Sequence, residues 1–232
     1  MIRLTKLGRR EMYFGTAMFI LLLAGLLWLA SITAAWVGAF LLIPLAVYVW
    51  LLSFFRDPQR TIPAEKGLFV SPADGTVADI TRLGEESALG RKAVSVGVFM
   101  SVFNVHVNRS PFAGTITEIK HADGAFLDVR KPEAWMANES TLVAMEIEYN
   151  GQSYPIAYRQ IAGFVARRIV TTVEVGDRVD RGQRVGMIKF GSRLELIVPE
   201  ELVGEVRVAI GERVAGGSTV LISAKEGNHD SE

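Results

Sequence analysis

One dipeptide in this chain of 232 residues could take part directly in bond making and breaking. The segment IKFGSRLELIVP, residues 188–199, places Gly191-Ser192 between two apolar, β-like runs. A serine hydroxyl becomes a nucleophile when a neighbouring base accepts its proton. A glycine has no Cβ, so it can adopt turn conformations that are strained for other residues. Ser192 would need a histidine and a carboxylate from elsewhere in the chain.

The candidate base is His106. The histidines are three, at 106, 121 and 229, and their scattered spacing does not fit a metal site, so we expect no metal. His106 lies in the β-prone stretch FNVHVNRSP, where an alternating strand would place Asn104, His106 and Asn108 on one face. Such a face predicts a polar pocket, although a structural histidine with satisfied hydrogen bonds remains the alternative.

The candidate carboxylate is Asp74, which an internal repeat distinguishes from the other acidic residues. SPADGTVADI at 71–80 recurs as SPFAGTITEI at 110–119, and Asp74 of the first copy corresponds to Ala113 of the second. A turn that accepts alanine does not need aspartate for its geometry. Asp74 is therefore a candidate for chemistry, with a turn-stabilising hydrogen-bond acceptor as the alternative.

The region after residue 55 consists mainly of short runs rich in Val, Ile and Thr, separated by Gly, Asp and Pro. A second repeat relates GDRVDRGQRVGMI at 176–188 to GERVAGGSTVLI at 211–222. These turn-and-strand units resemble the double-hammerhead units of biotinyl and lipoyl domains. The sequence therefore predicts a mainly β, barrel-like domain with duplicated units, and only residues 127–140 look irregular or helical.

The N-terminal region has a different composition. No charged residue occurs from Tyr13 to Phe55, which is long enough for two membrane helices, near 13–31 and 35–55. The hydrophobic core of a signal peptide is much shorter than this block. We therefore expect residues 1–55 to form a transmembrane helical hairpin.

Basic residues flank both ends of this apolar block, and they are Arg3, Lys6, Arg9, Arg10, Arg56 and Arg60. The positive-inside rule then places both ends of the hairpin in the cytoplasm. Residues 56–232 are expected to form a catalytic β domain on the cytoplasmic face of the inner cell membrane. The absence of cysteine agrees with a reducing compartment.

Four motifs in order carry a resemblance to a known family: FFRDPQRTIP at 54–63, SPADGTV at 71–77, FNVHVNRSP at 103–111 and KFGS at 189–192. Together with the preceding apolar block they resemble the short, archaeal-type phosphatidylserine decarboxylase proenzymes. The resemblance extends from the hairpin to about residue 222.

This resemblance implies that the chain cuts itself between Gly191 and Ser192. The products would be a β chain, 1–191, and an α chain, 192–232, in which Ser192 has become a pyruvoyl group. The pyruvoyl carbonyl would form a Schiff base with phosphatidylserine, and loss of CO2 would give phosphatidylethanolamine. The implied partners are this substrate, membrane lipid, the chain's own two fragments and a possible higher oligomer, but no nucleic acid.

The resemblance also implies residue roles. His106 and Asp74 match the acid–base positions, with His106 transferring protons and Asp74 orienting or charging it. Longer bacterial relatives have a second histidine where this chain has Arg109. Arg109, with Asn104, is a candidate for binding the substrate phosphate or carboxylate, and an exposed structural arginine is the alternative.

Three other functions share part of this pattern. A membrane-anchored lipoyl- or biotinyl-like carrier without catalysis would use a lysine at a hairpin tip, for which Lys189 is the candidate. An efflux adaptor would need long heptad helices, which the sequence lacks. A pyruvoyl enzyme acting on a soluble amino acid would leave the hairpin unexplained.

Overall fold

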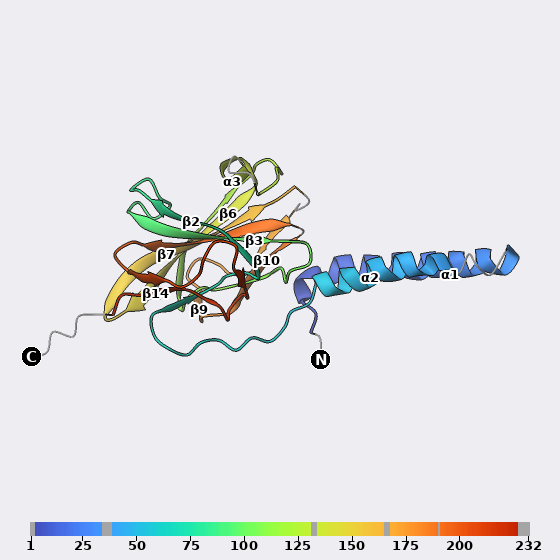
Figure 1. Ribbon diagram of the computed structural model, residues 1–232, viewed down its shortest axis with the longest axis horizontal. Coiled ribbons are helices and arrows are strands. Elements are labelled where there is room, and N and C mark those ends of the chain that lie inside the picture. The colour runs from blue at the N-terminus through green and yellow to red at the C-terminus, as the bar shows by residue number, and fades with distance from the viewer. Residues whose placement is uncertain (1–2, 34–38, 131–133, 165–167, 190, 227–232) are drawn as a thin grey trace, which may run out of the picture. The chain divides into compact units, whose positions relative to one another are not determined.

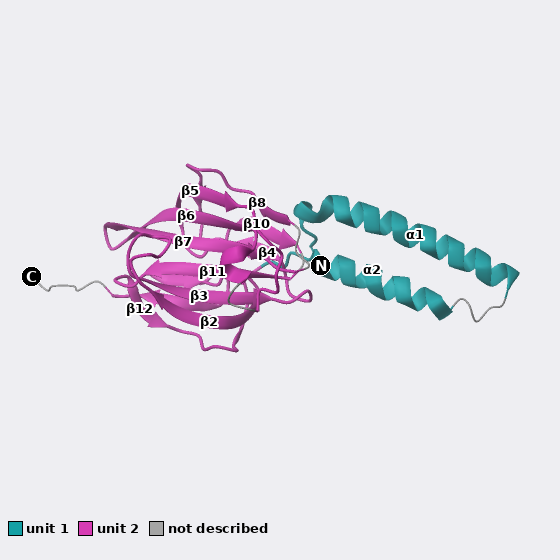
Figure 2. Cartoon of the chain, turned by 90° about the horizontal axis from the view of Figure 1, so that it is seen from above, with its two compact units in different colours: residues 1–59 teal, residues 60–232 magenta. Residues whose placement is uncertain are grey.

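The computed structural model describes residues 3–33, 39–130, 134–164, 168–189 and 191–226. The chain forms two compact units, Met1–Gln59 and Arg60–Glu232, which Figure 2 shows in teal and magenta. The first is called the helical unit here and the second the β unit. Each is described by itself.

The helical unit contains η1 (Lys6–Gly8), α1 (Arg9–Ile32) and α2 (Leu42–Phe54). The helix over Lys6–Ile32 is long and apolar enough to cross a membrane, whereas the apolar helix Ala39–Phe54 is shorter. At 1.5 Å per residue the shorter helix spans about 24 Å, against about 30 Å for a typical hydrocarbon core. The predicted start of the second helix, residue 35, lies outside the described residues.

The two helices pack against each other in an antiparallel arrangement. Phe19 and Tyr48 stack with ring centroids 4.6 Å apart, and the Tyr48 hydroxyl lies 3.1 Å from Thr16 Oγ1. Near the other end of the pair, Thr5 N donates to the Phe55 carbonyl at 2.9 Å. That both helices cross a membrane stays a prediction.

The β unit is mainly β-sheet, as the sequence predicted (Figure 1). Its strands are β1 Leu68–Val70, β2 Gly75–Leu83, β3 Ala93–Met100, β4 Val107–Arg109, β5 Gly114–Ala122, β6 Ser140–Tyr149, β7 Gln152–Ala162, β8 Arg168–Thr171, β9 Arg178–Val179, β10 Arg184–Lys189, β11 Ser192–Pro199, β12 Val203–Val206, β13 Arg213–Val214 and β14 Val220–Ala224. Within the stretch predicted to be irregular or helical, 127–140, lies the short helix α3, Ala134–Ala137.

The strands form three sheets, and their strand orders show two equivalent halves. The large sheet has the order β13-β2-β3-β11-β7-β6-β5-β9, and two small sheets have the orders β1-β14-β12 and β4-β10-β8. The half β13-β2-β3-β11 with the small sheet β1-β14-β12 therefore corresponds, strand by strand, to the half β9-β5-β6-β7 with the small sheet β4-β10-β8. The hydrophobic core is shared by strands of all three sheets, and it includes Phe69, Tyr158 and Ile188.

The internal repeats have equivalent hydrogen bonds in the two halves. Ser71 Oγ donates to the Ala73 carbonyl at 2.7 Å, and Ser110 Oγ donates to the Phe112 carbonyl at 2.7 Å. Likewise, Gly217 N donates to the Ser71 carbonyl and Gly182 N to the Ser110 carbonyl, both at 2.8 Å. The repeated sequences thus build the same turns twice.

The second copy is inserted between two neighbouring strands of the first. Strands β4 to β10 lie between β3 and β11 in the chain, yet β3 and β11 pair directly, with Met100 opposite Ser192. On its other side β11 pairs with β7, where Ser192 lies opposite Ala162. The chain must therefore return from the second copy to the centre of the large sheet at Ser192.

Strand β11 is buried on both faces. Leu194 and Leu196 face the core, so the alternation of the strand places Arg193 and Glu195 on the opposite face. The guanidinium of Arg193, only 1% exposed, bonds both oxygens of Asp79 and donates to Glu195 Oε1 at 3.0 Å. Its carbon lies 4.0 Å from the Trp135 ring centroid.

This network keeps the arginine charged. Burial lowers the pKa of Arg193, but hydrogen bonding to Asp79 and the charges of Glu195 and Asp79 outweigh burial, and the pKa is raised overall. Gly97 of β3 supplies the space for the guanidinium, because a Cβ on this residue would lie 2.0 Å from Arg193 Nη2.

We expect Gly97→Ala to lower the free energy of unfolding by about 1–3 kcal/mol, since overpacking displaces the buried guanidinium. Thermal and denaturant unfolding of the detergent-solubilised chain measure this loss. In an Arg193→Ala background the same Gly97→Ala change should have almost no effect. An equal loss in both backgrounds would show that the guanidinium is not what Gly97 accommodates.

Candidate functional site

The Gly191-Ser192 peptide lies where the chain enters β11. Gly191 has a φ of 57°, a left-handed conformation that glycine adopts at little cost. Ser192 is fully buried, and its Oγ has no hydrogen-bond partner among the described residues. A buried hydroxyl without a partner is unfavourable in a folded protein. Gly191 therefore adopts a turn conformation that favours glycine, and the role of Ser192 as a nucleophile stays a prediction.

The carbonyl of Gly191 packs directly on the backbone of Gly163. A Cβ on Gly163 would lie 2.2 Å from the Gly191 oxygen, closer than any real contact. Gly163 is not among the residues with positive φ, so its backbone conformation alone would accept a side chain. Glycine is required at this position because the Gly191 carbonyl occupies the space.

The described residues of the segment 125–139, which are 125–130 and 134–139, pack beside Ala162 and Gly163. Asn138 Nδ2 donates to the Ala162 carbonyl at 2.7 Å and to the Leu127 carbonyl at 2.8 Å. A Cβ on Gly163 would also lie 3.5 Å from Val129 Cγ1. The same segment carries Trp135, whose Nε1 donates to the Val129 carbonyl at 2.9 Å and whose ring covers Arg193. It therefore contacts Gly163, on which the Gly191 carbonyl packs, and Arg193, which follows Ser192.

His106 is fully buried just before β4. Its Nδ1 lies 3.0 Å from the Asn104 carbonyl oxygen, which can only accept a hydrogen bond. In the neutral imidazole the proton is thus on Nδ1, and the buried Nε2 carries the lone pair. This tautomer is the one that can accept a proton at Nε2.

The predicted alternating face of this stretch is wrong in part. Residues 104 and 106 precede the strand, and Val105 and Val107 are as well buried as His106. The reason is that the chain turns before it joins β4, with Asn104 N donating to the Ser101 carbonyl at 2.9 Å. The buried polar pocket is built instead around Asn108.

Asn108 connects this stretch to the strands around Ser192. Its Oδ1 accepts from Gln160 Nε2 at 2.9 Å, and its Nδ2 lies 3.9 Å from the sulfur of Met100, the residue opposite Ser192. Thr171 Oγ1 donates to Gln160 Oε1 at 3.1 Å. The buried amides of Asn108 and Gln160 therefore link β4 to β7 and, through the Met100 sulfur, to β3, and both β7 and β3 pair with β11 at Ser192.

Asp74 holds a turn of the first copy. Its Oδ1 accepts from Gly216 N at 2.8 Å, and its Oδ2 lies 2.5 Å from Arg60 Nη2. In the second copy the equivalents of Asp74 and Gly216 are Ala113 and Arg181, so this interaction belongs to one half only. These contacts fit the turn-stabilising alternative, and support of His106 by Asp74 stays a prediction.

The two residues predicted to bind substrate have structural contacts. Arg109 is 6% exposed and donates from Nη1 to the Gly182 carbonyl at 2.9 Å, so the alternative of an exposed arginine is wrong. Asn104 Oδ1 accepts from Ser101 N and from Ser101 Oγ, both at 2.8 Å. Substrate binding by either residue stays a prediction.

Lys189, the candidate attachment site of a carrier domain, is not exposed as that function would require. Lys189 is the last residue of β10 and only 7% exposed, whereas a carrier lysine must be presented at an exposed tip. His229 lies outside the described residues.

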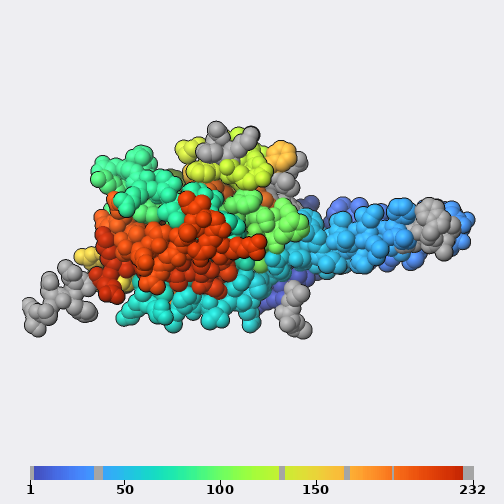
Figure 3. All heavy atoms as spheres, in the orientation of Figure 1, coloured from blue at the N-terminus to red at the C-terminus, as the bar shows by residue number. Residues whose placement is uncertain are grey.

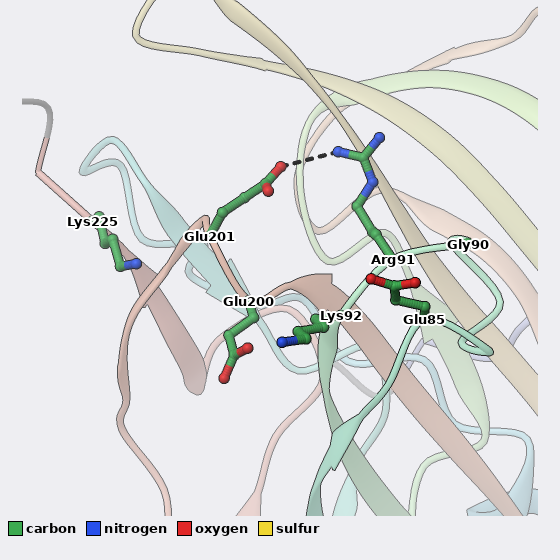
Figure 4. Close-up of a pocket in the computed structure, with 7 residues that line it drawn as sticks. All are labelled: Glu85, Gly90, Arg91, Lys92, Glu200, Glu201 and Lys225. Carbon is green, nitrogen blue, oxygen red and sulfur yellow. Dashed lines mark hydrogen bonds and ion pairs between the residues drawn. The ribbon is translucent and has the colours of Figure 1, made fainter.

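A polar surface pocket of about 690 Å³, shown in Figure 4, lies near the far end of β11. Its charged lining residues carry both signs, and Arg91 pairs with Glu201 at 3.0 Å. Glu200, also in the lining, is eight residues after Ser192, or about 26 Å along an extended strand. This pocket is therefore separate from the Gly191-Ser192 site.

Sequence reasoning missed Gln160, Asn138 and Gly163. One signal was present for Gln160, a polar residue in the apolar run YPIAYRQIA, which predicts an internal hydrogen bond. No local pattern marks Asn138 or Gly163, because their partners are backbone groups that are distant in the sequence.

Comparison with known proteins gives a consistent match. The phosphatidylserine decarboxylase family profile matches residues 47–222. A "Phosphatidylserine decarboxylase proenzyme" from Trichlorobacter lovleyi is 41% identical over 209 residues, which cover 90% of this chain and 91% of that protein. Proteins of the same name from Geobacter sulfurreducens and Carboxydothermus hydrogenoformans are 40% and 39% identical, covering 87% and 83% of this chain and 88% and 87% of their own lengths. The chain belongs to the phosphatidylserine decarboxylase family.

Proposed function

We propose that this chain is a phosphatidylserine decarboxylase that makes its own pyruvoyl group at Ser192. The observation that carries the proposal is the setting of the Gly191-Ser192 bond. The Ser192 Oγ is buried and has no hydrogen-bond partner among the residues that the structure describes. The preceding Gly191 has a φ of 57°, and its carbonyl packs against Gly163. This arrangement provides a nucleophile next to a fixed carbonyl carbon.

Self-cleavage then needs only groups of the chain and water. The Ser192 hydroxyl adds to the Gly191 carbonyl, the peptide nitrogen leaves with a proton, and an ester joins the two residues. Loss of the Ser192 α-proton breaks the Cβ–Oγ bond, which gives a Gly191 carboxylate and dehydroalanine at 192. Hydrolysis of the dehydroalanine releases ammonia and leaves the pyruvoyl group. His106, with its lone pair on Nε2, is the proposed base for the first step.

The pyruvoyl group supplies a carbonyl that withdraws electrons from the substrate Cα–carboxylate bond. The chain itself fixes residue 192, because β11 pairs with β3 on one side and with β7 on the other. We propose that His106 also returns the proton to the substrate Cα. Arg109 and Asn104 are proposed to bind the substrate phosphate or carboxylate, and Asp74 is proposed to orient His106.

We also propose the remaining features of the expected organisation. Residues 1–55 would anchor the chain by two transmembrane helices, and 56–232 would face the cytoplasm as the catalytic domain. Its duplicated units would be double hammerheads of the biotinyl and lipoyl type. The symmetric hydrogen bonds of the repeats support the last of these proposals.

Purified wild-type protein should separate on a denaturing gel into fragments 1–191 and 192–232, the smaller one lacking a free α-amino group. Ser192→Ala should remain one chain without decarboxylase activity, because alanine has no nucleophile. Intact mass spectrometry and release of CO2 from phosphatidylserine measure both properties. An active wild-type preparation that consists of one intact chain would contradict the proposal.

Gly163→Ala should slow self-cleavage by about 100-fold, since the added methyl group must displace the scissile carbonyl and small misplacements of reacting groups are costly. The time course of fragment formation after synthesis measures this rate. Gly84→Ala is the matched control, because a Cβ there would meet only the carboxylate of exposed Glu86. Normal cleavage by a folded Gly163→Ala protein would show that the contact does not position the carbonyl.

His106→Ala should slow self-cleavage by about 100-fold, the effect expected from loss of a general base. For Asp74 two substitutions separate its possible roles. Asp74→Asn keeps an oxygen that can accept from Gly216 N, so a role limited to the turn predicts normal cleavage. Support of His106 by the charge of Asp74 predicts slow cleavage for both Asp74→Asn and Asp74→Ala. Normal cleavage and full activity of His106→Ala would remove His106 from the mechanism.

A further inference from the structure

Large hydrophobic side chains on the surface of the β unit concentrate around the cleavage site. In the described part of this unit, the exposed ones are Phe103, Phe126, Leu127, Met136, Phe164, Val175 and Ile210. The first five lie on three segments beside the Gly191-Ser192 bond. These five residues are called the apolar rim here. Phe103, Met136 and Phe164 are 71%, 84% and 74% exposed.

Each of the three segments contacts the site through a residue near its rim member. Val102, next to Phe103, has its Cγ1 3.9 Å from where a Cβ on Gly191 would lie. Gly163, next to Phe164, is the residue on which the Gly191 carbonyl packs. The third segment, 125–139, stacks Trp135 on Arg193 and exposes Met136 beside it. Figure 3 shows the described parts of this segment in yellow-green, projecting from the surface of the β unit.

The rim cannot be explained as part of the core. Its side chains are solvent-exposed although the residues behind them, such as Val129, are buried. Apolar side chains gathered on one part of a surface usually mark a binding site for a protein or a lipid. The rim residues lie beside the Gly191-Ser192 bond, and Ser192 itself is buried, so a substrate has to approach Ser192 from the surface of the β unit.

We propose that the apolar rim enters the surface of a lipid bilayer and holds the part of the β unit around the Gly191-Ser192 bond at the level of the lipid head groups. This inference rests on the proposed function, because phosphatidylserine presents its amine and carboxylate at that level while its acyl chains stay in the hydrocarbon. Phenylalanine and methionine side chains gain favourable burial there without leaving polar groups unpaired. The contact is separate from anchoring by the N-terminal helices, since every rim residue belongs to the β unit.

The chain offers a matched control for this idea. Val175 and Ile210 are also exposed, at 63% and 65%, but they lie in equivalent turns of the two repeats. In these turns Gly176 N donates to the Ile116 carbonyl and Gly211 N to the Val77 carbonyl, each at 2.8 Å. The two residues therefore match the rim in exposure and apolar character but belong to another part of the fold.

Single-cysteine labelling of the full-length chain tests the contact, and the absence of native cysteine makes each label unique. Phe103→Cys, Met136→Cys, Phe164→Cys, Val175→Cys and Ile210→Cys would each carry an environment-sensitive fluorophore. The proteins are reconstituted in vesicles of phosphatidylcholine and phosphatidylserine that contain lipids with a spin label on the acyl chain. Quenching should be at least twofold stronger at the three rim positions than at the two control positions.

Equal quenching at rim and control positions would overturn the inference. Fluorescence that shows the rim labels to be shielded from water, without quenching by the spin-labelled lipid, would overturn it as well. The latter result would instead indicate a protein partner or a second copy of the chain. Decarboxylation of phosphatidylserine by the same preparations separates this outcome from failure of the proposed function. Activity without rim quenching would refute the lipid contact alone, and rim quenching without activity would refute the decarboxylase alone.

A second arm compares turnover of phosphatidylserine in vesicles with turnover of a short-chain, monomeric form. The double variant Met136→Ser with Phe164→Ser should lower the ratio of vesicle to monomer activity at least tenfold. Val175→Ser with Ile210→Ser should leave this ratio unchanged. An unchanged ratio in the rim variant, with normal self-cleavage, would contradict the inference.

Discussion

The close approach of the Gly191 carbonyl to the backbone of Gly163 is the constraint on which the site depends. A peptide bond is stable unless a nucleophile is held near its carbonyl carbon in a favourable direction. Here the carbonyl oxygen rests on a residue without a side chain, and the following serine is fixed by pairing to strands on both sides. The strand pairing at the centre of the sheet and the contact with Gly163 thus fix both sides of the Gly191-Ser192 peptide bond.

The two faces of β11 contribute differently to this rigidity. On the core face, Leu194 and Leu196 are buried with the strands of the duplicated fold. On the other face, the guanidinium of Arg193 is held by two carboxylates and covered by Trp135. Buried ion pairs often contribute little net stability, but they require one defined geometry. We therefore regard the Arg193 network as a device that fixes the start of β11 rather than as a major source of stability.

The duplication explains why the site occurs only once. Both copies form the same turns, but the second copy is inserted between β3 and β11 of the first. Only the first copy therefore has a long chain excursion that must return to a central strand, and Ser192 is the residue where it returns. The copies also differ at Asp74, which holds the turn at Gly216, and at its counterpart Ala113.

Much of this organisation could be predicted from local patterns. Short β-prone runs, two repeats and an uncharged N-terminal block gave the mainly β class and the apolar helix, and KFGS gave the candidate bond. The support of that bond was not predictable, since Asn138, Gly163 and Gln160 act on partners that only the fold brings near. The alternating face proposed for residues 104–108 failed because the chain turns at Asn104, and turns of this kind depend on side-chain contacts with neighbouring backbone.

The central claim is that the Ser192 oxygen attacks the Gly191 carbonyl and is then transferred to it. The most direct test is to produce the protein with serine that carries ¹⁸O in its hydroxyl group and to analyse the C-terminal peptide of fragment 1–191 by mass spectrometry. Elimination across Cβ–Oγ predicts one heavy oxygen in the Gly191 carboxylate. An unlabelled carboxylate at Gly191 would show that the bond is cut by water or by another group, and would contradict the account.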